Sequence, residues 1–259
     1  MDLLLIASAS DSDYLLDATW VVPTVQVCLL LSTAVSVHLS LSPPNPSVKS
    51  EDCCSGTEGT DTMFERFVQS ITYCSKCMVW LGALLNIFGI VVRCMFSYFA
   101  QSGWDGGIGN TSLLPPSQKI HPFMIVGAFS SVSAAALRVW CFRSLGPFFT
   151  FEITIRPKHE LVTHGPYAWV RHPSYTGIYL TLGGATLALG APGTWIAEYG
   201  VSTPFGCAVA CFWLLKCGFA FRGMSIRLRA EDQVLKETFG AEWEEYASRV
   251  PCKFIPGVI

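Results

Sequence analysis

The feature that most constrains this fold is a series of five apolar segments, several of them long enough to cross a lipid bilayer. A helix needs about 20 residues to span the hydrocarbon core. Inside lipid every backbone polar group must find a partner within the protein, so such segments fold as helices. We therefore predict an all-α integral membrane protein with about five transmembrane helices. The segments cover residues 20–41, 78–100, 122–142, 175–189 and 203–221.

The composition agrees with a membrane protein. Of the 259 residues, 51% are hydrophobic and only 14% are charged, whereas soluble domains carry about 25% charged residues. The formal net charge of −2 gives no indication of nucleic-acid binding. The first residues, MDLLLIASASDSD, have no basic region ahead of the apolar stretch, so we do not expect a cleaved signal peptide.

The last two apolar segments are expected to form a tight helical hairpin. The fourth is short, and Gly190-Ala191-Pro192-Gly193 ends it. Residues 194–202 would add a turn or an interfacial piece. Beyond the fifth segment, we expect a helix from about Arg222 to Phe239 with Gly240 as its C-terminal cap. A short helix over residues 241–249 would then complete a C-terminal cytosolic segment that covers the site.

Charges in the loops predict the orientation of the helices. Lys and Arg are concentrated in residues 143–172 and after residue 221, and the N-terminal tail has acidic residues only. Both basic segments are therefore placed in the cytosol, with the N-terminus outside. The loop 101–121 would face the lumen, where Asn110-Thr111-Ser112 is an acceptor for N-glycosylation. Residues 42–77 are interpreted as a polar cytosolic loop.

The cysteines do not indicate a metal site. Most of the 11 lie in apolar runs, where cysteine behaves as a small hydrophobic residue. Cys74 and Cys77 have the spacing of half a zinc site, but no second pair or histidine cluster accompanies them. Cys53-Cys54 lies in the polar loop, as an exposed pair or as a site of acylation. We predict no bound metal.

The run LVTHGPYAWVRHPSYTG, residues 161–177, indicates a functional site at the start of the fourth helix. Ionisable side chains at a membrane boundary are costly unless they are used. Pro173 suits the first turn of a helix, and the free N–H groups of that turn would face Arg171 and His172 as an anion site. The alternative is a basic flank that only anchors the helix. A flank needs only charge, however, whereas this run adds histidine, tyrosines, Trp169 and glycines.

A second polar cluster follows the fifth apolar segment. Arg227 and Glu231 are four residues apart and share one helix face. Their helix is the hairpin partner of the one entered at His172, so we expect the two clusters to face each other at the cytosolic boundary. The alternative is a surface ion pair worth about 0.3–0.5 kcal/mol. No Rossmann, P-loop, nucleophile-elbow or His-Glu-x-x-His signature is present in context.

These two runs resemble the signature of a known family. The run at 161–177 and the later run RLRAEDQVLKETFGAEWEEYASRVPCKFIPGV are similar to those of the isoprenylcysteine carboxyl methyltransferase family. LGPFFT, residues 145–150, also resembles the stretch that this family carries just upstream. We therefore take residues 135–259 as the catalytic methyltransferase region. Residues 1–134 match only as hydrophobic segments, and we take them as N-terminal transmembrane helices and a polar loop.

The resemblance implies an activity and a location. The enzyme would be multi-pass in the endoplasmic reticulum membrane, with its active site facing the cytosol. It would use S-adenosyl-L-methionine to methylate the C-terminal carboxylate of a prenylated cysteine, in CaaX-type proteins or in small prenylcysteine-like lipids. A carboxyl group of pKa about 3.5 is already ionised at neutral pH. The in-line displacement would therefore run on positioning rather than on a strong base, with the prenyl chain entering laterally between helices.

The resemblance also implies roles for single residues. Arg227, Arg171 and Glu231 are the expected catalytic residues. Arg227 would bind the substrate carboxylate, with Arg222 as a second candidate, because a guanidinium is a permanently charged fork. Glu231 would take the ammonium or ribose hydroxyls of the cofactor.

The expected cofactor-binding residues include both clusters. Arg171 and His172 would hold the cofactor's carboxylate, and two tyrosines would line its pocket. Tyr246 and Trp243 would pack the C-terminal helix over it, or simply belong to the protein core. The cofactor-binding set is Tyr167, Arg171, His172, Tyr175 and Glu231.

Three alternatives remain open at the level of sequence. A methyltransferase of the same fold could act on another lipid, such as a phospholipid amine or a terpenoid carboxylate. An NADPH-dependent sterol reductase would carry Asn-Tyr-x-Gly and Arg-Asp-x-x-x-Cys, where this chain has Ser174-Tyr175-Thr176-Gly177 and Ala230-Glu231-Asp232. A non-catalytic scaffold would not need Arg171, His172, Arg227 and Glu231 together.

Overall fold

The structure is a computed structural model that describes residues 3–46, 63–101, 119–151, 154 and 159–254. Within these residues it contains helices and turns and no strand, as predicted for an all-α protein. The helices are α1 (Leu3–Ser40), α2 (Met63–Gln101), α3 (Pro122–Leu145), α4 (Pro173–Leu189), α5 (Pro204–Phe239) and α6 (Ala241–Arg249). The glycosylation sequon at Asn110 and the Cys53-Cys54 pair lie outside the described residues.

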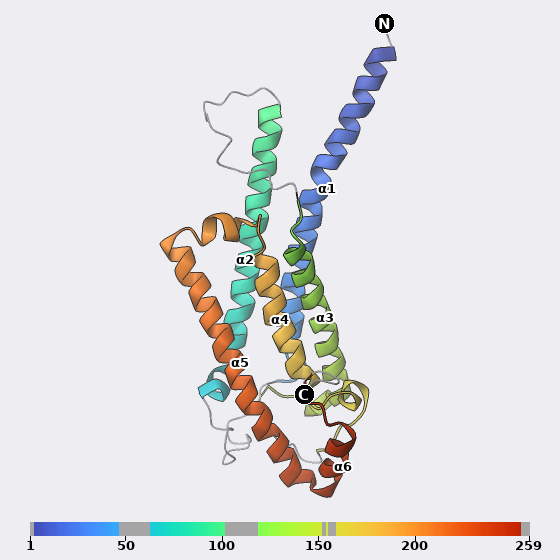
Figure 1. The fold of residues 1–259 in the computed structure, drawn as a ribbon, viewed down its shortest axis with the longest axis vertical. Coiled ribbons are helices and arrows are strands. Elements are labelled where there is room, and N and C mark those ends of the chain that lie inside the picture. Colours follow the sequence, from blue (N-terminus) through green and yellow to red (C-terminus); the bar gives the residue numbers. More distant parts are fainter. Residues whose placement is uncertain (1–2, 47–62, 102–118, 152–153, 155–158, 255–259) are drawn as a thin grey trace.

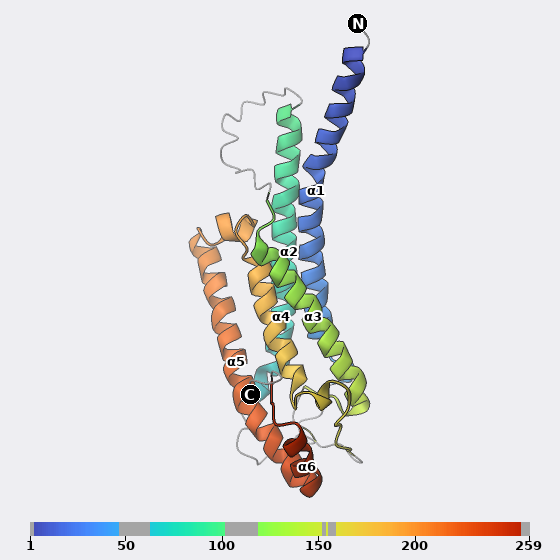
Figure 2. The same ribbon diagram turned by 45° about the vertical axis from the view of Figure 1, so that its right-hand side comes forward.

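Four of these helices are long and apolar enough to cross a membrane: α1, α2, α3 and α5. They run along the length of the molecule, with α4 among them and α6 at one end (Figures 1 and 2). The remaining predicted span, the fourth along the sequence, is α4, which has 17 residues and is shorter than the roughly 20 needed to cross the hydrocarbon core. The membrane character and the all-α class are confirmed, and a count of five crossings stays a prediction.

Close packing of α3 on α4 depends on small residues. A Cβ atom on Gly127 of α3 would lie 2.4 Å from the backbone nitrogen of Ala188 and 2.6 Å from the carbonyl oxygen of Gly184 on α4. Small residues allow two helix backbones to approach in this way within a membrane. The contact fixes α4, and with it the polar residues at its start.

The predicted hairpin between α4 and α5 is present. Side chains of α2 form hydrogen bonds with the residues that connect the two helices. Asn86 is buried; its Nδ2 donates to the carbonyl of Leu189 at 3.3 Å, and its Oδ1 accepts from the N–H of Ile196 at 3.0 Å. Arg93 donates to the carbonyl of Gly193 at 3.3 Å. The turn itself includes a short π-helical stretch, Ile196–Gly200.

The prediction of a polar loop over residues 42–77 is wrong from Met63 onward, because α2 begins there. Its first turns carry Phe64, Val68 and Ile71 on one face, which packs against α5 in an apolar cluster. Gly223 of α5 makes room for the Phe64 ring, since a Cβ there would lie 2.4 Å from it. Polar residues on the remaining faces hide this helix from a hydropathy reading of the sequence.

At the other end of the chain the predicted helices are confirmed. Residues 222–239 continue the membrane helix without a break, as the second half of α5. Gly240 ends α5 with a φ of 54° and donates its N–H to the carbonyl of Lys236, a conformation that glycine adopts at low cost. α6 follows at once. The end of α5 therefore projects beyond α4 and carries α6 with it (Figure 1).

We predict that Gly127→Ala destabilises the protein by roughly 1–3 kcal/mol, because the added methyl overpacks the α3–α4 contact. Gly183→Ala on α4 is the matched control, since its Cβ would have no heavy atom within 4 Å. Thermal unfolding of both variants in detergent measures the difference. Equal melting temperatures for the two variants would contradict this account of the contact.

Candidate active site

A cavity of about 170 Å³ lies where the starts of α2 and α4 meet the ends of α3 and α5. Its outer part is polar, with Arg171, His172, Tyr175 and Glu231 in its wall. Its inner part is apolar and lies between α2, α4 and α5. The lining there comes from Phe64, Val68, Ile71, Ile178, Leu182, Ala220 and Met224. The cavity crosses the predicted division at residue 135, because α2 supplies part of its wall.

Asp232 on α5 joins the two predicted clusters. Its Oδ1 lies 2.8 Å from Nε2 of His172, and its Oδ2 lies 3.3 Å from both Arg171 Nη1 and Lys253 Nζ. The carboxylate is buried, where an unpaired charge would be costly. Sequence reasoning missed Asp232, although its place directly after Glu231 could have indicated it.

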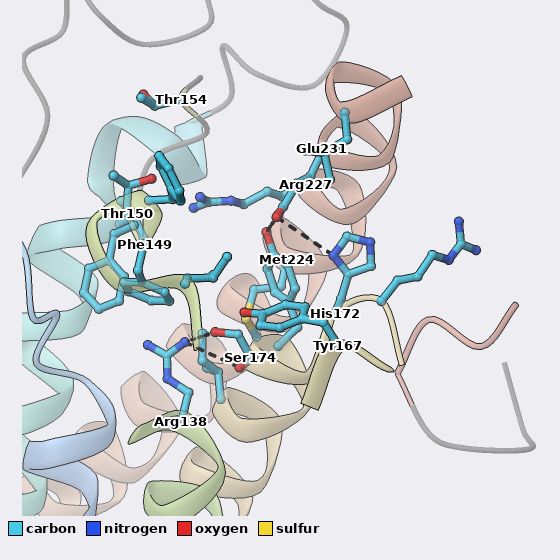
Figure 3. Close-up of a pocket in the computed structure, with 18 of the residues that line it drawn as sticks. Arg138, Phe149, Thr150, Thr154, Tyr167, His172, Ser174, Met224, Arg227 and Glu231 are labelled. Carbon is cyan, nitrogen blue, oxygen red and sulfur yellow. Dashed lines mark hydrogen bonds and ion pairs between the residues drawn. The ribbon is translucent and has the colours of Figure 1, made fainter. Parts of the chain in front are cut away.

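A second contact between the clusters is made by Glu231. Tyr175 donates its hydroxyl hydrogen to Glu231 Oε2 at 2.6 Å, and Nδ1 of His172 lies 4.0 Å from Glu231 Oε1. Figure 3 shows the side chains of Glu231 and His172 converging at this side of the cavity. The prediction that the two clusters face each other is therefore confirmed. The His172 ring is held by Asp232 and lies between the Asp232 carboxylate and the Glu231 carboxylate.

The chain after α6 pairs with the backbone just before α4. The N–H groups of Arg171 and His172 donate to the carbonyls of Cys252 and Lys253 at 3.0 and 2.9 Å. Thr176 donates its hydroxyl to the carbonyl of Phe254. These two N–H groups lie before α4, so the anion site predicted from the N–H groups of its first turn stays a prediction. The side chains of Arg171 and His172 remain at the cavity wall.

Tyr246 fastens α6 to the segment before α4, beside the cavity. Its hydroxyl donates to the carbonyl of Tyr167 at 2.8 Å. Burial raises the pKa of Tyr246 to about 12, so the phenol stays a neutral donor at physiological pH. Burial also raises the pKa of Tyr167, whose ring lines the cavity. Trp243 lies over the guanidinium of Arg171, 5.6 Å from Cζ to the ring centre.

Arg138 on α3 is a cavity residue to which sequence reasoning gave no role. It is only 1% exposed. Its Nε donates to the carbonyl of Ser40 at 2.9 Å and its Nη1 to the hydroxyl of Ser174. Its Nη2 is buried and has no hydrogen-bond partner among the described residues. The signal in the sequence is an arginine inside an apolar segment.

Aromatic rings and a glycine shape the space around Arg138. Its Cζ lies 4.7 Å from the ring centre of Phe142 and 5.4 Å from that of Phe149. A Cβ on Gly177 would come within 2.7 Å of the Arg138 side chain. Figure 3 shows Arg138 and Arg227 on different sides of the cavity.

Arg227 lines the cavity and is buried, so its interpretation as half of a surface ion pair is wrong. Its Nε lies 3.2 Å from Oε1 of Glu65 on α2. Glu65 lies in the segment predicted to be a loop, so this partner could not be expected. Arg222, the second candidate for the substrate carboxylate, is exposed and does not line the cavity.

The assembled site suits an amphiphile with an anionic head. Guanidinium groups of Arg138 and Arg227 lie where the polar and apolar parts of the cavity meet. Arg171 and Glu231 offer a cationic and an anionic partner farther out. The described residues contain no group of three or more His, Cys, Asp or Glu side chains that could hold a metal ion.

Comparison with known proteins supports the resemblance predicted from the two runs. Residues 125–203 match the model of the isoprenylcysteine carboxyl methyltransferase (ICMT) family. A rice protein (Oryza sativa subsp. indica) named "Probable protein-S-isoprenylcysteine O-methyltransferase" is 30% identical over 142 residues, covering 54% of this chain and 65% of its own length. Protein-S-isoprenylcysteine O-methyltransferase B of Arabidopsis thaliana is 34% identical over 117 residues, 44% of this chain and 50% of its own.

A relative with a different name is also similar. The cobalt-zinc-cadmium resistance protein CzcN of Cupriavidus metallidurans is 28% identical over 173 residues, covering 66% of this chain and 62% of its own length. This chain thus spans about half to two thirds of the length of these relatives. The resemblance to the family is confirmed, and the substrate is not fixed by the relatives alone.

We predict that Asp232→Ala loosens the chain on both sides of α4. Three basic groups would lose their carboxylate, and breaking such a buried pair costs about 3–5 kcal/mol. Hydrogen exchange should rise in peptides that contain Arg171 and His172, whose N–H groups depend on the docked tail. Glu237→Ala, an exposed carboxylate of the same helix, should change stability by no more than about 0.5 kcal/mol. Unchanged exchange in Asp232→Ala would show that the tail docks without this carboxylate.

Proposed function

Because residues 125–203 match the model of the isoprenylcysteine carboxyl methyltransferase family, we propose that this chain is a protein-S-isoprenylcysteine O-methyltransferase. It methylates the C-terminal carboxylate of a prenylated cysteine, in CaaX-type proteins or in small prenylcysteine-like lipids. S-adenosyl-L-methionine supplies the methyl group. The observation that carries the proposal is a cavity in which the two predicted runs meet, charged at one end and apolar at the other.

The outer part of the cavity fits a zwitterionic cofactor. Arg171 lines it, and its Nε is buried without a hydrogen-bond partner among the described residues. Arg171 and His172 are the proposed partners of the cofactor's carboxylate, and Glu231 of its ammonium or ribose hydroxyls. Tyr167 and Tyr175 form the wall. Because His172 is held by Asp232, its ring is fixed in place before any ligand binds.

The junction of the two parts fits the substrate's carboxylate. The reacting carboxylate is ionised at neutral pH, so the protein needs to orient it rather than to remove a proton. Arg227 was the expected ligand, but the nearby carboxylate of Glu65 offsets its charge. Arg138 Nη2 is buried and without a partner among the described residues, and we add it as a second ligand of the substrate carboxylate. The catalytic set then comprises Arg171, Arg227, Glu231 and Arg138.

The inner part of the cavity fits the lipid tail. It lies between α2, α4 and α5 and is lined by apolar side chains. A prenyl group placed there would be shielded from water while its carboxylate stays at the charged junction. The distribution of basic residues after α3 and after residue 221 supports an active site that faces the cytosol. By the same resemblance, we place the protein in the endoplasmic reticulum membrane.

A second candidate is a methyltransferase of the same fold that acts on another lipid acid or amine. The similarity to CzcN, a relative with a different name, is the observation that favours this second candidate. Substrate choice separates it from the first proposal, since both would use the same methyl donor. A sterol reductase would instead require NADPH.

We predict that Glu231→Ala and Arg171→Ala each abolish methyl transfer while the proteins still insert into membranes. The assay uses membranes that contain the chain, methyl-labelled S-adenosylmethionine and N-acetyl-S-farnesylcysteine, and it counts base-labile methyl ester. Arg229→Ala is the control, because Arg229 is an exposed residue of the same helix. Full activity in both site variants would refute the assignment. Donor binding without ester would favour the second candidate.

We further predict that Arg138→Lys lowers kcat/KM for the prenylcysteine substrate by about ten-fold or more, because an ammonium cannot reproduce the guanidinium fork. The affinity for the methyl donor should change little. The exposed Arg222→Lys provides a matched control. Isothermal titration with the donor and initial rates with the substrate separate the two effects. An equal loss of donor affinity would place Arg138 in the cofactor site instead.

A further inference from the structure

A groove runs between α1 and α3, on a different face of α3 from Arg138. The two helices lie side by side (Figures 1 and 2). On α1 the groove is lined by Ser36 and Leu39. On α3 it is lined by Val132, Ala135, Ala136, Val139, Trp140 and Arg143, whose spacing of three and four residues places them on one helix face. None of these residues lines the cavity of the active site.

Side chains of different size shape this groove. Ala135 and Ser36 are buried, whereas Val132 and Trp140 are 45% and 50% exposed. Ala136 offers only a methyl group between Val132 and Trp140, which lie about one turn before and one turn after it on α3. Apart from the serine and the arginine, the lining residues are hydrophobic, and none is acidic. Most of the groove therefore suits a hydrocarbon chain.

The groove has the length of one membrane leaflet. Val132 and Arg143 are eleven residues apart, which is about 16–17 Å along a helix. The hydrocarbon core is about 30 Å thick, so one leaflet contributes about 15 Å. The groove therefore has room for an acyl chain and the start of its head group. A transmembrane helix of a partner protein would instead need a surface of about 30 Å.

Arg143 gives a positive charge to the end of the groove that lies at the end of α3. It is exposed and makes no ion pair with any residue that the structure describes. A guanidinium binds phosphate through paired hydrogen bonds. The ammonium of a zwitterionic head group would find no carboxylate in the lining. The charge therefore favours a lipid whose head group is anionic as a whole.

Trp140 connects this groove with the active site. A Cβ on Gly165 would lie 3.3 Å from Trp140 Nε1 and 2.8 Å from Ser144 Oγ, so the backbone at Gly165 packs against the end of α3. Gly165 begins the short 3₁₀ helix Gly165–Ala168. Tyr167 of that helix lines the cavity. Trp140 thus lies beside both the groove and a segment of the cavity wall.

We propose that the groove binds one anionic phospholipid, taken from the leaflet at whose boundary the active-site cavity lies. Its acyl chain lies along Val132, Ala136 and Val139, and its phosphate binds Arg143. The bound lipid holds Trp140 against the 3₁₀ helix and so stabilises that part of the cavity wall. This lipid is distinct from the methylated substrate, and its binding does not depend on the proposed function.

Native mass spectrometry of the full chain in detergent, titrated with phosphatidylinositol or phosphatidylcholine, measures the affinity for each lipid. The unmodified protein should bind phosphatidylinositol about five-fold more tightly, the factor that one basic residue contributes at a membrane surface. Arg143→Gln should abolish this preference. Ala136→Phe should lower the affinity for both lipids, because the added ring fills the groove.

Two variants of exposed residues on other helices are matched controls: Arg66→Gln on α2 and Ala208→Phe on α5. Both should bind the lipids as the unmodified protein does. Equal affinities for the two lipids in the unmodified protein would overturn the proposal. Undiminished binding by Ala136→Phe would overturn it as well, because the head group would then be held without the groove. A dimer that Ala136→Phe dissociates would assign the groove to a second copy of the chain instead.

Hydrogen exchange tests where the lipid binds. Phosphatidylinositol should slow exchange in peptides that contain residues 165–168 of the unmodified protein, because Trp140 is then held against them. The same lipid should have no such effect on Arg143→Gln. Unchanged exchange of these residues at saturating phosphatidylinositol would contradict the contact through Trp140, and with it the proposed position of the lipid.

Discussion

The rest of the site depends on the buried carboxylate of Asp232. It lies against the His172 ring, the Arg171 guanidinium and the Lys253 ammonium, and so joins the start of α4, the end of α5 and the tail after α6. Such a network adds little to stability relative to an apolar core, but it is costly to break and specifies one arrangement. Because the tail is docked by the same network, the backbone N–H groups of Arg171 and His172 find their partners there. One side chain therefore fixes the geometry of both functional runs.

The membrane determines at which depth polar and apolar residues lie along the helices. Continuous helices carry the chain from the apolar interior to the boundary, so a residue's number along α2 or α5 also gives its depth. Charged groups collect at one level, where Glu65 meets Arg227 and Tyr175 meets Glu231. Below that level the cavity walls come largely from apolar residues of α2, α4 and α5. A cavity with a charged mouth and an apolar interior follows from this layering, and it matches the polarity of a lipid that ends in a carboxylate.

Local sequence signals predicted the parts of the fold that depend on local physics. The break after α4, the Gly240 cap and the face-to-face clusters follow from turn residues, helix period and the short hairpin, and each was confirmed. The start of α2 was predicted wrongly, because Phe64, Val68 and Ile71 form a narrow apolar stripe among polar residues. Glu65 and Arg227 are 162 residues apart, so neither could be assigned as the other's partner. Asp232 follows Glu231 directly, but no sequence signal gave it a role of its own. Arg138 stood out as a charged residue in an apolar segment, and nothing in the sequence indicated which residues it contacts.

The charges around the cavity indicate what a ligand must supply. Arg227 is paired with the carboxylate of Glu65, and Asp232 is paired with Arg171, His172 and Lys253. Arg138 differs, because its hydrogen bonds within the described residues go to neutral oxygens of Ser40 and Ser174, and aromatic rings cover it. An arginine stays charged in a protein, and a buried charge gains most from an anion that brings its own negative charge. A substrate carboxylate at the junction of the polar and apolar parts would complete this site, and the tail attached to it would lie in the apolar part.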